Sequence, residues 1–166
     1  MKTPITNRQG IIDFYNAFSD SNFEVIRNML HPDCTLEFPG TFHPNLVRGC
    51  DSITDLLMQM QKGLDGSLRF HTKWAMFEGD MVAAHWYTTA KTKHGGSYMN
   101  RGVAWFNLKD GLVWEFLDFL DTEMLTAFWP EGIATKNFNH ANRLVSNLYD
   151  YAPESVQSYF DQHIRA

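Results

Sequence analysis

Four long stretches in the middle of the chain have the composition of β-strands, and only short turns separate them. These strands are predicted near residues 68–77, 81–91, 97–108 and 112–120. The turns between them are supplied by Gly79-Asp80, Gly95-Gly96 and Asp110-Gly111. Because parallel neighbours need a long crossover connection, such short turns predict an antiparallel meander. Any fold proposed for this chain must be built around that sheet.

Helical patterns precede the sheet. One helix is predicted after Thr6-x-x-Gln9, a second after Ser21-x-x-Glu24, and a third over residues 51–62. Each shows apolar residues at helical spacing, and the first two follow a possible capping box. A short strand that ends at Pro39-Gly40 lies between the second and third helices. Helices first and a meander afterwards predict an α+β domain with the helices packed on one face of the sheet.

After the sheet the pattern returns to helix. Asp121 is placed to cap a helix that runs to Phe128, and further helices are predicted near 138–150 and 154–164. A length of 166 residues fits one compact domain. We therefore expect a domain over residues 1–128 and a helical C-terminal extension over 129–166 that packs on it.

Composition narrows the function. The formal net charge of −5 argues against nucleic-acid binding, because the sequence has no basic stripe that could neutralise phosphates. The N-terminus has no secretory apolar region, and no apolar run approaches the roughly 18 residues that span a bilayer. Cys34 and Cys50 form no recognised motif and are expected to be free thiols in a reducing compartment. These features predict a soluble cytoplasmic protein with neither nucleic acid nor membrane as partner.

Aromatic residues are abundant, whereas cofactor motifs are missing. Thirteen Phe, six Tyr and five Trp predict either an aromatic-lined cavity or an apolar surface covered by a partner. The seven histidines show no metal-ligand spacing, and the chain has no phosphate loop, nucleophile elbow or dinucleotide fingerprint. We expect no metal and no cofactor.

The amino-acid sequences of several segments resemble those of a known superfamily. The similar segments are "FYNAFSDSNFEVIRNMLHPDCTLEFPG", the "RG" before the third helix, "GDMVAAHW" and "RGVAWFNLKDGLVWEFLDFLD". They resemble the nuclear transport factor 2-like superfamily, also called ketosteroid-isomerase-like or SnoaL-like, over about residues 8–128. The resemblance implies a cone-shaped, curved antiparallel sheet wrapped on the N-terminal helices, with a deep cavity open at one end. The superfamily includes isomerases, cyclases, dehydratases, epoxide hydrolases and non-enzymatic binding modules, so the fold does not fix the function.

The ketosteroid isomerase pattern matches poorly. Its catalytic tyrosine falls on Phe14, with Tyr15 next to it. Its general base falls near Glu37, and its second aspartate, which stays protonated, falls on Ala104. Steroid isomerisation is therefore disfavoured.

Two other enzyme patterns match at one position each. Asp118 is similar to the last-strand aspartate of limonene-epoxide-hydrolase-like enzymes, but their Arg and Asp fall on Trp86 and Thr88. His71 is similar to the histidine of scytalone-dehydratase-like enzymes, but their Tyr-Asp pair falls on Phe18-Ser19. No single enzymatic template is complete.

Asp118 is the leading candidate for a catalytic group. Strand alternation places it on one face with Trp114 and Phe116, opposite the face of Asp121. If this face lines the cavity, desolvation raises the pKa of Asp118 and suits it to general acid or base work. The alternatives are a hydrogen-bonded structural aspartate and a residue at the wet end of a strand. Asp121 needs no such explanation, because helix capping accounts for it.

The remaining candidate residues are polar partners of Asp118 and side chains that form the walls of the cavity. Tyr15 on the first helix and His71 on the first long strand are candidate catalytic partners of Asp118, although a tyrosine hydroxyl more often satisfies a core carbonyl. Asn100 and Arg101 lie on opposite faces of a strand, so only one of them enters the cavity, and Asn100 is the candidate. The expected substrate-binding walls are Trp74, Trp86, Trp114 and Phe116. For Trp74 the expectation rests on simple strand alternation, which places Trp74 in the apolar interior and His71 on the opposite face of the sheet.

The sequence supports two functional hypotheses. The first is a cofactor-independent enzyme that transfers protons on a compact apolar substrate, by isomerisation, dehydration, cyclisation or water addition. The second is a non-catalytic module of the same fold that binds a small ligand or a protein, since the usual partners of Asp118 are missing. Apolar residues on both faces of the sheet also predict a homodimer through the convex face.

Overall fold

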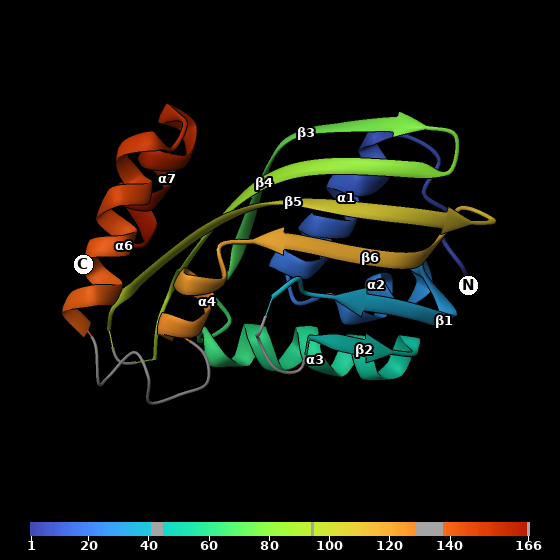
Figure 1. Cartoon of the computed structure of the whole chain (residues 1–166), viewed down its shortest axis with the longest axis horizontal. Coiled ribbons are helices and arrows are strands. Elements are labelled where there is room, and N and C mark those ends of the chain that lie inside the picture. The colour runs from blue at the N-terminus through green and yellow to red at the C-terminus, as the bar shows by residue number, and fades with distance from the viewer. Residues whose placement is uncertain (41–44, 94, 129–137, 166) are drawn as a thin grey trace.

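The computed structural model describes residues 1–40, 45–93, 95–128 and 138–165. The predicted helices and strands are present in the predicted order, and one short strand that was not predicted lies before the third helix (Figure 1). The elements are α1 (Arg8–Ser19), α2 (Phe23–Met29), β1 (Leu30–Glu37), β2 (Leu46–Arg48), α3 (Cys50–Gly63), β3 (Arg69–Glu78), β4 (Met81–Lys91), β5 (Ser97–Lys109), β6 (Leu112–Leu120), α4 (Thr122–Phe128), α6 (Phe138–Tyr151) and α7 (Glu154–His163). The four long strands begin and end within one residue of their predicted bounds.

The sheet has six strands in the order β2-β1-β6-β5-β4-β3. Strands β3 to β6 form the predicted antiparallel meander, and β2 pairs antiparallel with β1. Strand β1 is parallel to β6, which is possible because residues 38–111 lie between them and supply the long connection that parallel neighbours need. The sheet is curved and unclosed, and α1, α2 and α3 lie on its concave side (Figure 1). The predicted α+β class with a C-terminal helical extension is confirmed.

Aromatic packing holds α1 against the concave face. Phe14 contacts Phe106 of β5 and Phe116 of β6 edge-on, with ring centroids 5.8 Å and 5.9 Å away. Phe106 and Phe116 stack on each other at 4.6 Å. Edge-on and stacked contacts add to the free energy gained by burying these large rings. This cluster anchors α1 on the concave face of the sheet.

An irregularity in β3 reverses the faces of its second half. Thr72 pairs with Trp86, but Trp74 pairs with His85, which leaves Lys73 as an extra residue. One extra residue in a strand turns every later side chain to the opposite face. Trp74 therefore lies on the convex face beside His85, with ring centroids 5.6 Å apart. The prediction that simple alternation places Trp74 inside is wrong for this reason.

A second irregularity lies at the start of β6. Val113 pairs with Leu108 and Glu115 with Asn107, so Trp114 is the extra residue. The indole of Trp114 contacts neighbouring side chains instead of continuing the inner row. From residue 116 onward the pairing is regular, and the predicted alternation holds.

The C-terminal helices pack beside the curled ends of the long strands. Figure 1 shows α6 and α7 next to one another at the end of the sheet where β3, β4 and β5 bend. Tyr159 of α7 contacts His71 of β3 with ring centroids 4.8 Å apart. Among the described residues, no helix is both long and apolar enough to cross a membrane.

Candidate functional site

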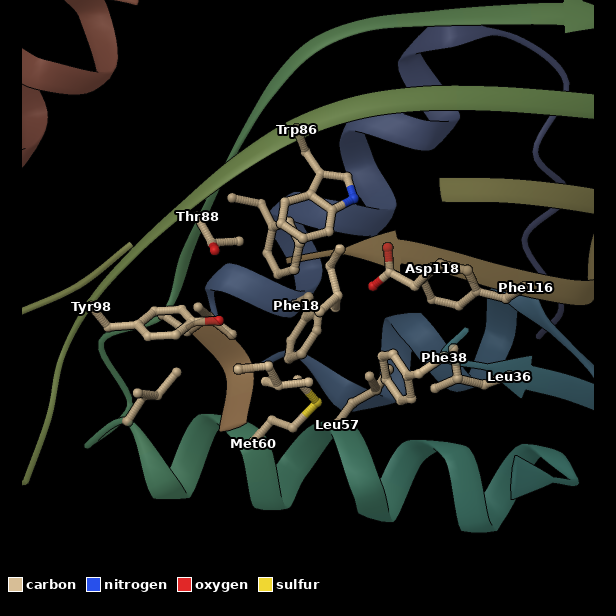
Figure 2. Close-up of a pocket in the computed structure, with 15 residues that line it drawn as sticks. Phe18, Leu36, Phe38, Leu57, Met60, Trp86, Thr88, Tyr98, Phe116 and Asp118 are labelled. Carbon is tan, nitrogen blue, oxygen red and sulfur yellow. The ribbon is translucent and has the colours of Figure 1, made fainter. Parts of the chain in front are cut away.

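A narrow cavity lies between the concave face of the sheet and helices α1, α3 and α4 (Figure 2). Its empty space, including the opening to solvent, is about 620 Å³, but only about 30 Å³ of it is wide enough to hold the centre of a water molecule. The walls are almost entirely apolar. The lining residues are Phe18, Leu36, Phe38, Leu57, Met60, Leu64, Leu68, Phe70, Trp86, Thr88, Tyr98, Phe116, Asp118, Leu120 and Leu125.

Sequence periodicity explains how these residues reach the cavity. Leu57, Met60 and Leu64 are spaced three and four residues apart, so they share one face around the end of α3. Alternate residues of β6, from Phe116 to Leu120, share the concave face of the sheet. The apolar side chains that helix spacing places on α3 therefore face those that strand alternation places on β6, and the cavity lies between them.

Asp118 is the only carboxyl among the described residues that line this cavity. Its side chain comes from the second half of β6 and is buried, with 7% of its surface exposed. Burial raises the pKa of Asp118 from 3.8 to about 7. The face that Asp118 shares with Phe116 lines the cavity, a point that the sequence left open, and the alternative of a wet strand end is excluded.

The indole N–H of Trp86 is the polar group that most affects this carboxyl. It acts as a donor toward Asp118 and keeps the pKa from rising further. The contact falls short of hydrogen-bond geometry, because both Trp86 Nε1 and Asp118 Oδ1 are buried without a partner. A donor and an acceptor are therefore left unsatisfied beside each other.

Gly102 makes room for the indole of Trp86. It lies on β5, where it pairs with Trp86 on one side and Leu120 on the other. A Cβ at this position would lie 2.6 Å from Cζ2 of Trp86 and 2.7 Å from the carbonyl oxygen of Phe119. Because carbon atoms do not approach that closely, only glycine lets the indole lie across β5 in this way.

Tyr15 is close to Asp118 but behind the cavity wall. It is buried, with 1% of its surface exposed, and its hydroxyl has no hydrogen-bond partner. Its ring stacks on Phe70, with centroids 4.7 Å apart, and it is not among the lining residues. Burial and, to a smaller extent, the charge of Asp118 raise the pKa of Tyr15 well above its usual value. The structure therefore brings Tyr15 within electrostatic reach of Asp118.

His71 is separated from the cavity. Its Nε2 is 2.9 Å from Oγ1 of Thr89, and its ring packs against Tyr159 of α7. Burial lowers the pKa of His71 to about 4, so it is neutral at physiological pH. The expectation that His71 accompanies Asp118 fails on position, since β3 places its side chain under the C-terminal helices.

Two of the four expected aromatic walls are present. Trp86 and Phe116 line the cavity, whereas Trp74 and Trp114 do not. Trp114 contacts His31, with ring centroids 4.7 Å apart, and the ammonium group of Lys109 lies 4.5 Å from its ring. The strand irregularities described above explain both departures.

Asn100 is buried and holds its neighbours in place instead of lining the cavity. Its Nδ2 donates to Tyr98 Oη at 3.0 Å and to the carbonyl oxygen of Asp121 at 3.1 Å. Its Oδ1 accepts from the backbone N–H groups of Arg101 and Asp121 at 2.7 Å and 3.3 Å. Asn100 therefore positions the Tyr98 hydroxyl and the start of α4. Asp121 caps that helix as predicted, since its Oδ1 accepts from the N–H of Met124 at 3.0 Å.

Sequence reasoning missed the polar residues Tyr98 and Thr88 as lining residues. Burial raises the pKa of Tyr98, against a smaller opposing effect of Asn100 and Thr88. Thr88 Oγ1 itself is buried and forms no hydrogen bond by geometry. Tyr98 shares strand parity with Asn100, and Thr88 shares it with Trp86, so the alternation of β5 and β4 was the available signal.

The described residues contain no group of three or more His, Cys, Asp or Glu side chains placed to hold a metal ion. The polar groups that the cavity lining offers are few. These are one buried carboxyl, one indole N–H and the hydroxyls of Thr88 and Tyr98.

Comparison with known proteins gives a family match and similar folds. The model of the SnoaL-like domain matches residues 11–116. TerC, solved with polyporic acid, is 23% identical with a TM-score of 0.61, over 69% of this chain and 91% of TerC. A protein from Jannaschia sp. CCS1, described as a SnoaL-like polyketide cyclase, is 18% identical with a TM-score of 0.60, over 78% of this chain and 98% of that one.

A third similar structure is an epoxide hydrolase of the LEH-like type from M. tuberculosis. It is 19% identical with a TM-score of 0.56, over 68% of this chain and 80% of its own. At these identities the likeness concerns the fold alone. No curated protein sequence matches the chain significantly.

Proposed function

The chain belongs to the family of SnoaL-like domains, and from this premise we propose that it is a cofactor-independent enzyme that transfers protons on a compact apolar substrate. The reaction class is isomerisation, dehydration, cyclisation or water addition. Solved structures of the same fold include a described polyketide cyclase, an epoxide hydrolase and TerC with bound polyporic acid. Small-molecule chemistry in the cavity fits this set.

The observation that carries the proposal is the state of Asp118. At neutral pH a carboxyl with a pKa of about 7 is about half protonated and half ionised. General acid–base groups work best under that condition, because each form is available for its step. Asp118 would take a proton from the substrate and return it at another atom.

The groups around Asp118 could stabilise the negative charge that develops on the substrate during such a proton transfer. The indole N–H of Trp86 points to the same region of the cavity as the Asp118 carboxyl (Figure 2). A donor fixed in an apolar space stabilises a developing oxyanion more than one in water does. Tyr15, behind the wall, adds a hydroxyl within electrostatic reach of Asp118 and is proposed as its partner. No role in this reaction is assigned to His71.

A binding module is the second candidate, and one observation favours it. The positions where similar hydrolases carry an Arg–Asp pair hold Trp86 and Thr88, and Asp118 is the sole carboxyl of the described lining. A single buried carboxyl is enough for ligand recognition. An enzyme with one such group needs the substrate itself or a water molecule to complete the proton path.

Proton exchange tests the proposal without knowledge of the natural substrate. Small enolisable aromatic ketones are incubated with the protein in D₂O, and deuterium at the carbon next to the carbonyl is followed by NMR. We expect Asp118→Asn to slow exchange on the accepted ketones by about 100-fold or more. Asp121→Asn, the same change at an exposed helix cap, is the matched control and should retain the wild-type rate. Ketones that bind but exchange at the same rate with both proteins would favour the binding module.

We also propose that the protein forms a homodimer through its convex face. Large apolar side chains there are exposed, among them Phe119 at 50%, Trp105 at 39% and Val103 at 36%. Val103 pairs directly with Phe119 across β5 and β6, so these side chains form a continuous patch. Sedimentation at micromolar concentration should give a dimer, and Trp105→Glu should give a monomer. A wild-type monomer would contradict this.

A cytoplasmic location completes the proposal. It is supported by the two cysteines, Cys34 and Cys50, which are buried free thiols as expected in a reducing compartment. We further propose that residues 1–128 form the functional domain and that residues 129–166 are an extension, whose described part, residues 138–165, packs on it. The contact between His71 and Tyr159 supports that packing.

A further inference from the structure

The two cysteines of the chain lie on elements that pack against each other. Cys34 belongs to β1, and Cys50 is the first residue of α3, which packs on β1 (Figure 1). The backbone N–H of Gly49 donates to the carbonyl oxygen of Cys34 at 2.8 Å. Because hydrogen-bonded strand partners have Cα atoms about 5.5 Å apart, Cys50, the next residue along the chain, is a near neighbour of Cys34.

Sequence periodicity turns both cysteine side chains into the same interface. Cys34 alternates with Leu36, so the two share the concave face of β1. Cys50 precedes Ile53 and Leu57 by three and seven residues, and all three are buried on the inner side of α3. Burial and, to a smaller extent, the charge of Cys50 raise the pKa of Cys34 to about 12. The two sulfur atoms are therefore within electrostatic reach of each other.

The two thiols differ in their access to solvent. Cys34 is fully buried, whereas 9% of the surface of Cys50 is exposed. Cys50 lines an open surface pocket, of which about 470 Å³ is wide enough to hold the centre of a water molecule. The other residues that line this pocket are Lys2, Arg27, Pro32, Gly49, Asp51 and Ser52. A small solute can therefore reach Cys50 from solvent, and Cys34 lies behind it.

This arrangement differs from that of a cysteine used for packing alone. A buried cysteine behaves as a small apolar side chain and needs neither a pocket nor a second thiol. Here one thiol lines a pocket that admits water, and a second thiol lies behind it. Redox-sensing cysteines have this form, in which an accessible thiol is placed next to a resolving one.

We propose that Cys50 is a site of reversible oxidation by hydrogen peroxide and that Cys34 is its resolving thiol. The sulfur of Cys50 attacks one peroxide oxygen, the O–O bond breaks, and Cys50 becomes a sulfenic acid while the other oxygen leaves as water with the thiol proton. The sulfur of Cys34 then attacks the sulfur of Cys50, and the sulfenic oxygen leaves as water with the proton of Cys34. In total the two thiols lose two electrons and two protons, and one peroxide gives two water molecules.

The disulfide would connect two walls of the cavity, because β1 carries Leu36 and α3 carries Leu57, which both line it. It would also close a loop of about 15 residues, which restricts the unfolded chain and so stabilises the fold. The free thiols of the reduced protein agree with this inference, since disulfides in a reducing compartment are transient and reversed by thiol reductants. The inference does not depend on the reaction proposed for Asp118.

Peptide mapping of the full-length protein tests the inference. Reduced protein is treated with hydrogen peroxide, free thiols are blocked with iodoacetamide, and the protein is digested without reductant for mass spectrometry. We expect a peptide pair joined through Cys34 and Cys50 in most chains, and its loss after treatment with dithiothreitol. The map also separates cysteine oxidation from methionine oxidation.

Cys34→Ala and Cys50→Ala form a matched pair that assigns the two roles. In Cys34→Ala the sulfenic acid of Cys50 has no resolving thiol, so dimedone should label it about tenfold more than it labels Cys50→Ala, whose remaining thiol is shielded. The oxidised wild type should melt about 5 °C above the reduced wild type, and neither variant should show this rise.

Four results would overturn the inference. Both cysteines could stay reduced in the folded wild type under peroxide that oxidises the urea-unfolded chain, which would leave them as packing residues. The disulfide could join Cys50 of two chains, or dimedone could label Cys34 in preference to Cys50. A lower melting temperature of the oxidised protein would show that the bond strains the fold and that the folded structure does not bring the thiols together. The wild-type map decides the question even if a variant fails to fold.

Discussion

Replacing Asp118 with asparagine removes the charge that burial penalises, and its effect on stability follows from the pKa. Burial raises the folded-state pKa of Asp118 from 3.8 to about 7. At about 1.4 kcal/mol per unit, the ionised carboxyl costs the folded state roughly 4 kcal/mol, an order-of-magnitude figure. The neutral amide of the asparagine variant carries no such cost at any pH.

The sign of the pH dependence follows from proton counting. Between pH 4 and 7 the folded protein keeps the Asp118 proton, whereas the unfolded chain has lost it. Stability therefore falls as pH rises through this window and levels off above about pH 7. The asparagine variant lacks this decline.

Urea unfolding from pH 4 to pH 8 measures the difference directly. The unfolding free energy of Asp118→Asn minus that of the wild type should grow by about 4 kcal/mol across the range. Asp121→Asn, which keeps an oxygen for the helix cap, should follow the wild-type profile. Parallel profiles for wild type and Asp118→Asn would refute the claim that burial holds this carboxyl near neutrality.

Three further substitutions test the framework of the site. Gly102→Ala should destabilise the fold by about 1–3 kcal/mol and displace the indole of Trp86, because the added carbon overlaps the ring; an unchanged Trp86 N–H signal would argue against this. Asn100→Ala should cost about 3 kcal/mol in urea unfolding, since it removes the four hydrogen bonds of a buried side chain, and a loss below about 1 kcal/mol would show that they contribute little. Gln61→Ala should cost a similar amount, because its buried amide bonds backbone groups of α1 and of the segment before β3, and an unchanged midpoint would contradict that role.

The sequence predicted the sheet, and the face that Asp118 shares with Phe116, for simple reasons. Short turns require antiparallel strands, and strand alternation from residue 116 onward is regular. The same rule misplaced Trp74 and Trp114, because each lies at or just beyond an extra residue in its strand. Such irregularities depend on pairing with a neighbouring strand and leave no clear local pattern.

Other features of the site depend on contacts between segments that are far apart in the sequence, so the sequence alone did not predict them. His71 lies under α7 through its contact with Tyr159, far along the chain, and nothing near His71 in the sequence indicates that helix. Tyr98 was predictable, since it shares strand parity with Asn100. The space that Gly102 leaves for an indole on the neighbouring strand appears only once the register is known.

A direct titration of Asp118 tests the central claim, that the cavity holds a carboxyl able to gain and lose a proton at neutral pH. The carboxyl carbon of Asp118, assigned by comparison with Asp118→Asn, is followed by ¹³C NMR from pH 3 to pH 9. The account predicts a midpoint of about 7. A midpoint near the unperturbed value of about 3.9 would contradict it and leave Asp118 as an ordinary ionised aspartate.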